Sequence, residues 1–186
     1  YVGGIQSFPL SSQWIDYLEN QMEFYENIPK KILNHVTVRL YPHDYEWSQF
    51  QRWKDRFPNS KIDKCKKSIN DAVANTNLVV SGWNTTAYLE TMQSNIPTII
   101  FWTPSYFEIR GNAKQHFQNL KKVGIFHDNP KSAVNHIKEI WEDIDSWWNQ
   151  NDVIVARNEF TNKYACSKNI SKKLSSIFKD MSNKDI

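Results

Sequence analysis

The sequence predicts an α/β fold: a three-layer, Rossmann-like sandwich with a mainly parallel five-stranded sheet and C-terminal helices. Residues 78–102 give the first indication, because they have the order strand, loop, helix, strand that repeats in such a sheet. The second strand of this unit, residues 97–102, is apolar almost throughout, which is typical of a strand buried on both faces. Strands and helices alternate along most of the chain, so helices are expected on both sides of the sheet.

The first third of the chain predicts a helix followed by two strands. Apolar residues recur at helical spacing from Trp14 to Tyr25, starting at Ser11 or Ser12, and Pro29 ends this helix. Residues 35–41 alternate in polarity and are rich in β-branched side chains, which predicts a strand. The elements expected next are a helix at 47–57, a strand at 61–63 and a helix at 68–74 that begins with a capping-box sequence.

The remainder contains the central unit and a helical C-terminal part. Within the unit, the strand at 78–80 is followed by a helix at 84–94, which Asn95 and Pro97 end. Gly124 fits the end of the helix after it. The later elements expected are a helix at 112–122, a strand at 125–128, and helices at 129–149, 152–165 and 169–181.

Composition limits the class of protein. Hydrophobic residues make up 40% of the 186 residues, which is enough for a sizeable core, and the net charge of +3 does not by itself indicate nucleic acid as a partner. The two cysteines match no metal spacing, and no apolar run reaches the roughly 20 residues that span a bilayer. The expected organisation is a lead-in and interdomain helix at 1–30, a Rossmann-like domain at 31–150 and packing helices at 151–186. Because the chain begins at Tyr1, we expect a piece of a longer protein.

The loop at residues 81–86 is the first candidate site. It follows a buried strand and leads into the unpaired N–H groups of a helix start, where anions bind favourably. Glu90 lies one turn further along and is placed to accept hydrogen bonds from ribose hydroxyls. The alternative is that Thr85 or Thr86 only caps the helix and that Glu90 is solvated. The predicted binding residues of this loop and helix are Ser81, Gly82, Asn84, Thr85, Thr86 and Glu90.

Two further polar clusters follow the neighbouring strands. Arg39 and His43 lie at and beyond the end of the strand at 35–41, where they are candidates to meet a phosphate or a sugar carboxylate. The alternative for this cluster is a turn with a solvated His43–Asp44 pair. The loop after the strand at 97–102 is a candidate to hold a base or a sugar, or it is an ordinary surface loop. Its predicted binding residues are Thr103, Tyr106 and Arg110.

Several kinds of chemistry are not predicted. The five histidines have no ligand spacing on one helix, so no metal site is expected. No Gly-rich phosphate loop or dinucleotide fingerprint is present, and Val80-Ser81-Gly82 lacks the first glycine of a nucleophile elbow.

The run NLVVSGWNTTAYLETMQSNIPTIIFW resembles the nucleotide-sugar-binding, C-terminal half of glycosyltransferases of the two-Rossmann GT-B type. With VRLYPHDYEW, GIFHDNP and Trp147-Trp148, residues 35–165 are similar to bacterial surface-carbohydrate transferases, and Kdo transferases that use CMP-activated sugars are a related group. The resemblance implies that the 81–86 loop holds the donor phosphates, that Glu90 holds the ribose, and that Arg39 and His43 lie near the phosphate or the sugar. It implies a CMP- or UDP-linked donor and no metal.

The resemblance also sets the expected partners. The acceptor would be a surface polysaccharide or glycolipid, and an N-terminal domain of the same protein would supply the other wall of the cleft, so no general base is assigned. A cytoplasmic location is expected, at the inner face of the membrane if the lysine-rich tail touches anionic lipid rather than being a solvated helix face. Two alternatives stay open: a nucleotide-sugar 2-epimerase and a non-catalytic interaction module that uses Trp141, Trp147 and Trp148.

Overall fold

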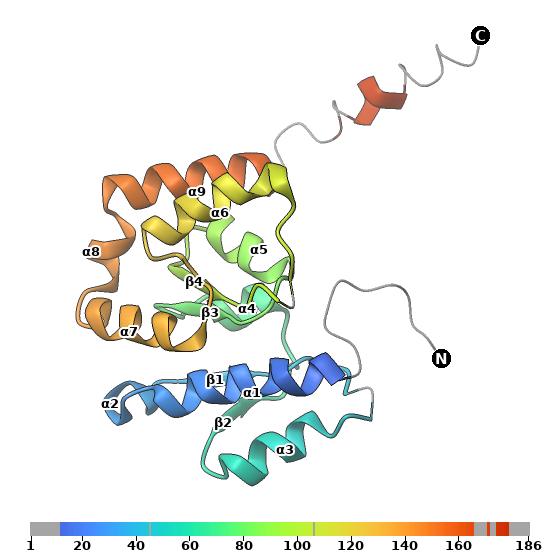
Figure 1. The fold of residues 1–186 in the computed structure, drawn as a ribbon, viewed down its shortest axis with the longest axis vertical. Helices are drawn as coiled ribbons and strands as arrows, with labels where there is room; N and C mark the ends of the chain where they lie inside the picture. The colour runs from blue at the N-terminus through green and yellow to red at the C-terminus, as the bar shows by residue number, and fades with distance from the viewer. Residues whose placement is uncertain (1–11, 45, 106, 166–170, 172–173, 179–186) are drawn as a thin grey trace.

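The computed structural model describes residues 12–44, 46–105, 107–165, 171 and 174–178, and within them it confirms the α/β class (Figure 1). The strands are β1 (Thr37–Arg39), β2 (Lys61–Asp63), β3 (Val79–Ser81), β4 (Thr98–Phe101) and β5 (Phe126–His127). The helices are α1 (Ser12–Asn27), α2 (Lys30–Leu33), α3 (Gln49–Arg56), α4 (Ile69–Val73), α5 (Ala87–Gln93), α6 (Gly111–Lys122), α7 (Pro130–Ile140), α8 (Ile144–Trp148) and α9 (Asn151–Tyr164).

The prediction of one five-stranded sheet is wrong. β1 and β2 form a two-stranded parallel sheet, and β3, β4 and β5 form a three-stranded parallel sheet in that order. The apolar side chains of the smaller sheet, Val38 and Ile62, pack into a hydrophobic cluster of their own around Trp14 and Trp53. Residue pattern indicates which segments are strands, but this separate core decides that β1 pairs with β2 and not with β3.

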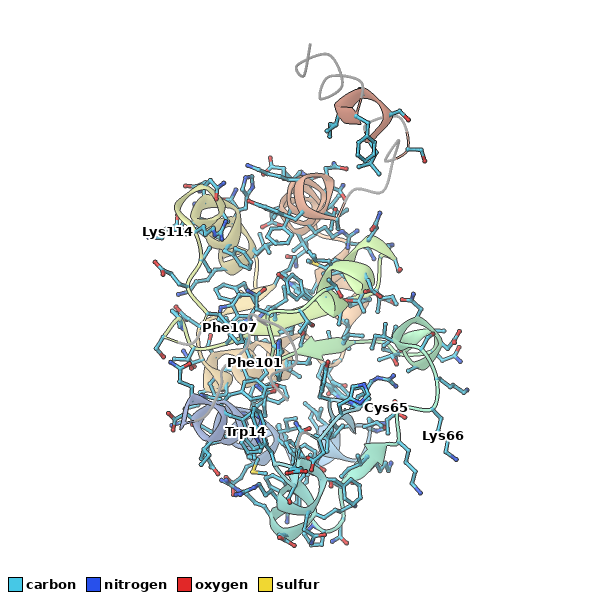
Figure 2. All side chains as sticks on the ribbon, turned by 90° about the vertical axis from the view of Figure 1, so that its right-hand side faces the viewer. Trp14, Cys65, Lys66, Phe101, Phe107 and Lys114 are labelled. Atoms are coloured by element: carbon cyan, nitrogen blue, oxygen red, sulfur yellow. The ribbon has the colours of Figure 1, made fainter. Side chains whose placement is uncertain are left out.

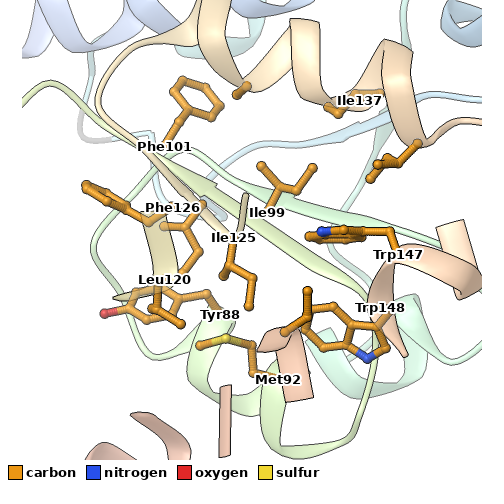
Figure 3. Close-up of a cluster of buried hydrophobic side chains, with 14 of the residues drawn as sticks. Tyr88, Met92, Ile99, Phe101, Leu120, Ile125, Phe126, Ile137, Trp147 and Trp148 are labelled. Carbon is orange, nitrogen blue, oxygen red and sulfur yellow. The ribbon is translucent and has the colours of Figure 1, made fainter. Parts of the chain in front are cut away.

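The three-stranded sheet lies between helices, as the sequence predicted. Figure 1 shows α5, α6 and α9 on one side of this sheet and α7 on the other, with α1 beneath α7. All four residues of β4 are buried, so this strand is covered on both faces. Figure 3 shows the core around it, where Ile99 and Ile125 meet Trp147 and Trp148 of α8. Burial of this apolar surface is the main source of stability for the larger half.

Capping side chains mark the starts of α4, α7 and α8. Ser68 Oγ accepts a hydrogen bond from the Asp71 main-chain N–H (3.1 Å), which confirms the predicted cap of α4. The single helix predicted at 129–149 is wrong, because α7 ends at Ile140 and α8 begins at Ile144. Asp143 Oδ1 accepts a hydrogen bond from the Ser146 N–H (2.9 Å), so Asp143 starts a new helix where the apolar spacing alone suggested continuation.

Candidate functional site

The candidate site lies where the loops after β1, β3 and β4 approach one another. Trp83 lies in the loop after β3. Its ring centroid is 6.1 Å from that of Tyr41, which follows β1, and 6.5 Å from that of Phe107, which follows β4. In Figure 2, Trp14 lies in the half built from α1 and α3, and Phe107 lies in the half built around the larger sheet. Trp83 therefore lies between loops that belong to both halves.

The 81–86 loop is ordered by its own hydrogen bonds. The Ser81 hydroxyl donates to the Trp83 carbonyl (3.1 Å), and Asn84 Oδ1 accepts from the Tyr88 hydroxyl (3.0 Å). Burial raises the pKa of Tyr88 to about 12, so this phenol remains a donor at neutral pH. Ser81 and Asn84 are thus brought to the site, but both already have a protein partner.

Gly82 connects this loop to α1. Its carbonyl accepts a hydrogen bond from Gln21 Nε2 (2.9 Å), and a Cβ atom at position 82 would lie 2.0 Å from Gln21 Oε1. A larger residue would therefore displace the Gln21 amide. Sequence reasoning selected Gly82 but missed Gln21, since nothing in the helical pattern of α1 distinguishes this side chain from a solvated one.

The start of α5 leaves two predicted groups accessible. Thr86 is exposed, has helical backbone angles and makes no side-chain cap, whereas Thr85 Oγ1 accepts a long hydrogen bond from the Ala87 N–H (3.4 Å). The Glu90 carboxylate is half-buried and forms no hydrogen bond or ion pair with any residue that the structure describes. Thr85 therefore has the weak capping role, while Thr86 and Glu90 keep their hydrogen-bonding capacity for a ligand.

Arg39 is engaged within the smaller sheet. Because Arg39 lies opposite Asp63 in the parallel register, their side chains form an ion pair, and Arg39 Nη2 also donates to the Lys67 carbonyl (2.6 Å). The guanidinium would have to divide its N–H donors between these partners and any phosphate. Its predicted role in binding stays a prediction.

The end of β1 continues into the cap of α3. Asp44 accepts hydrogen bonds from the main-chain N–H groups of Ser48 (2.8 Å) and Gln49 (2.6 Å). His43 is exposed, with its ring 6.0 Å from that of Tyr41. The structure therefore gives Asp44 a capping role and leaves His43 at the surface of the same loop.

The loop after β4 contributes less to the described site. The Thr103 hydroxyl donates to Asn20 Oδ1 (3.4 Å), which links this loop to α1. Arg110 is exposed at the start of α6, where its carbonyl accepts from the Ala113 N–H (2.9 Å). Tyr106 lies outside the described residues.

Sequence reasoning missed an aromatic pocket at this junction. Trp14 came from a helical stripe and was interpreted only as packing, and Trp83 lies inside the polar loop, so neither carried a recognisable motif. The ring centroids of Trp14 and Trp47 are 4.6 Å apart, and both rings line this pocket. We call it the aromatic pocket; its lining residues are Trp14, Tyr41, His43, Asp44, Trp47, Gln49 and Trp83.

No group of three or more histidine, cysteine, aspartate or glutamate side chains that could hold a metal ion is found in the part of the chain that the structure describes. The described helices include no segment with the length and hydrophobicity of a membrane span.

The fold and the loop cluster define an α/β protein with a candidate ligand site where the loops after parallel strands meet, as is usual for this class. The chain belongs to the LIC12162 family of transferases, because the model of the LIC12162 family transferase matches residues 1–178. Comparisons with curated proteins and with solved structures gave no significant match. The chain is therefore a transferase, which agrees with the transfer activity expected from the sequence.

Proposed function

We propose that this chain is the donor-binding part of a GT-B-type glycosyltransferase, corresponding to its C-terminal half. It would hold a CMP- or UDP-linked sugar for transfer to a surface polysaccharide or glycolipid. Membership of a transferase family supports group transfer. The resemblance of residues 78–102 to nucleotide-sugar-binding units supports the donor class.

The observation that carries the proposal is the contact of Trp83 with both Tyr41 and Phe107, which brings three strand-end loops together. Ligands of α/β proteins bind at such edges, because successive loops supply polar groups around a common space. A second domain would supply the acceptor side and the general base, as the resemblance implies. His43 and Arg39 remain the candidates on this chain for contact with the reacting groups.

Within this site, Thr86 and Glu90 have the clearest roles. The Thr86 hydroxyl would donate to a phosphate oxygen of the donor, and the Glu90 carboxylate would accept from the ribose hydroxyls. Both follow from groups that lack a hydrogen-bonding side-chain partner in the described structure. Hydrogen bonds to charged groups contribute about 1.5–3 kcal/mol each, so each role has a measurable consequence.

We expect Thr86→Val and Glu90→Gln each to weaken nucleotide binding about tenfold, because the first removes a charge-assisted hydrogen bond and the second replaces a charged acceptor by a neutral one. Isothermal titration calorimetry with CMP, UDP and their sugar conjugates measures the effect. Ser94→Ala, at the other end of α5, is the matched control and should leave the affinity unchanged. Unchanged affinity in both site variants would contradict the assignment.

A peripheral membrane contact is part of this proposal. The side chains of Leu174, Ile177 and Phe178 are 46%, 51% and 64% exposed, and Figure 1 shows their helix (red) apart from the body of the molecule. Lysines at 168, 172, 173 and 179 flank them in the sequence. Apolar side chains with neighbouring lysines fit an anionic lipid surface, where each basic residue contributes about 1 kcal/mol.

We expect Phe178→Ser to reduce binding to phosphatidylserine-containing vesicles about tenfold, since it removes one large apolar side chain from the lipid contact. Vesicle co-sedimentation at low and high salt measures this. Val155→Ser is the matched control, because Val155 is 48% exposed on α9 of the body. Equal binding to neutral vesicles, or no loss in the Phe178 variant, would rule out this contact.

A further inference from the structure

We propose that α1 positions the loops of the candidate site and that Gln21 is the positioning residue for the 81–86 loop, an inference that rests on the proposed function. Side chains of this one helix contact the loops after β1, β3 and β4, which together form the site. The contacting pairs are Trp14 with Trp47, Tyr17 with Trp83, Gln21 with Gly82, and Asn20 with Thr103.

The α1 residues of these pairs lie on one side of the helix. Residues three or four apart are neighbours on a helix surface, so Trp14, Tyr17 and Gln21 form one row. Trp14 and Tyr17 are buried and Gln21 is half-buried, so this row is turned toward the protein and not toward solvent. The row gives α1 a contact with each strand-end loop at a fixed spacing along its axis.

The hydrogen bond from Gln21 Nε2 to the Gly82 carbonyl (2.9 Å) fixes one peptide unit of the 81–86 loop. A trans peptide is planar and its C=O and N–H point in opposite directions, so a carbonyl held toward α1 also sets the direction of the Trp83 N–H. Tyr17, one turn earlier, packs edge-on against the Trp83 ring, with centroids 4.6 Å apart. The main chain and the side chain at Trp83 are therefore both held from α1.

The helix is itself fixed to both halves of the molecule. Figure 1 shows α1 between α7 and α3. The Phe24 ring stacks on that of Phe101 in β4, with centroids 4.8 Å apart, and Arg56 of α3 forms ion pairs with Glu19 (2.5 Å) and Glu26 (2.9 Å). A helix fixed in this way can hold a binding loop in one geometry, and such preorganisation increases affinity.

The space at Gly82 allows the contact to be broken from either end. A Cβ atom at this position would lie 2.0 Å from Gln21 Oε1 and 2.4 Å from Nε2. These atoms are the end of a flexible side chain, so an alanine at position 82 fits once the Gln21 amide turns away and its hydrogen bond is lost. Gly82→Ala and Gln21→Ala should therefore have the same effect.

The test is a double-mutant cycle of Gln21→Ala and Gly82→Ala. Calorimetry with CMP, UDP and their sugar conjugates measures affinity. Fluorine NMR of the chain labelled with fluorotryptophan reports the Trp83 ring without any ligand, and the signal of the buried Trp148 is the internal reference for the fold. Gln13→Ala is the matched control, because Gln13 is exposed on the same helix.

We expect each single variant to weaken nucleotide binding about fivefold and the double variant to weaken it no further, because all three lose the same hydrogen bond. All three should shift or broaden the Trp83 signal and leave that of Trp148 unchanged, and Gln13→Ala should alter neither. Gln21→Met keeps the length of the side chain without its amide and should behave as Gln21→Ala does.

The two readouts separate this inference from the proposed function. If the unchanged chain binds no nucleotide but the variants alter the Trp83 signal, the proposed function fails and the positioning role of Gln21 holds. Losses that multiply in the double variant, normal binding by Gln21→Met, or an unaltered Trp83 signal would each overturn the inference while leaving nucleotide binding as a separate result.

Discussion

Replacing Trp148 by alanine is expected to lower the free energy of unfolding by about 3–5 kcal/mol, a large share of the 5–15 kcal/mol typical of a domain. Trp148 is 2% exposed and lies in the core beside the larger sheet (Figure 3). Its indole N–H donates to Asn95 Oδ1 (3.1 Å), and the Arg157 guanidinium lies 4.3 Å from its ring centroid. The substitution therefore removes packing, a hydrogen bond and a cation–π contact at one position.

The buried charge of Arg157 makes the stability of the fold sensitive to substitution of Trp148. Arg157 is itself buried, so its charge is poorly solvated, and this burial lowers the pKa of its guanidinium. Its hydrogen bond to the Trp148 carbonyl (2.9 Å) survives a side-chain change, but the aromatic face does not. Removing the ring leaves a buried charge with less compensation.

Urea unfolding at neutral pH measures the effect of Trp148→Ala. Trp148→Phe serves as the conservative variant, because it keeps an aromatic face for Arg157 and loses only the indole N–H and part of the packing. We expect it to lose less than half as much stability. A loss below about 1 kcal/mol for Trp148→Ala would contradict this account, because that value is typical of a surface substitution.

Acidification from pH 6.5 to pH 4 is expected to remove up to about 3 kcal/mol of stability through His127 alone. Burial lowers the pKa of this histidine to about 4, against 6.5 for an ordinary histidine. Between these values the unfolded chain binds a proton that the folded chain does not. This contribution is therefore complete above pH 6.5 and is lost as the pH falls toward 4.

The hydrogen bonds of His127 explain why the neutral ring suits the fold. The Gly124 carbonyl can only accept, so Nε2 carries the proton and donates to it (3.0 Å). Nδ1 is then the acceptor, and the Ser132 hydroxyl donates to it (2.7 Å). Burial also lowers the pKa of His136, whose ring lies 5.5 Å away, and this adds to the acid sensitivity in the same direction.

The measurement is a series of urea unfolding curves between pH 4 and pH 8. His127→Gln should flatten the dependence between pH 6.5 and pH 4, even if it lowers stability at pH 7. His35→Gln is the control, because His35 is exposed. Asp128, whose pKa is lowered by its hydrogen bond with Lys121, loses most of its contribution below pH 4, which is outside this range. A curve for His127→Gln parallel to that of the unchanged chain would contradict the prediction.

The sequence predicted those features of the fold that depend on neighbouring residues, and not those that depend on contacts between distant ones. The strand at 61–63 and the Ser68 cap were correct because β-branching, turn residues and capping act within a few positions. The division into two sheets was not predictable, since Val38 and Ile62 could have packed on either core. The break before α8 was missed because Asp143 interrupts an otherwise regular apolar spacing.

In the candidate site, too, only the features that depend on neighbouring residues were predicted. The 81–86 loop was found because it follows a buried strand, and its position depends on local chain order. Trp14 and Gln49 were missed because they reach the aromatic pocket from helices distant in sequence. The Arg39–Asp63 pair was also unforeseen, as it depends on the register between β1 and β2.

The division of the interior into two hydrophobic clusters has a consequence for local unfolding. The cluster around Trp14 and Trp53 is the smaller one and rests on two short strands, so it should open with a lower free energy than the core around β4. Two walls of the aromatic pocket, Trp14 and Trp47, belong to or pack against that cluster. Amide hydrogen exchange is therefore expected to be faster in α1 and α3 than in β4.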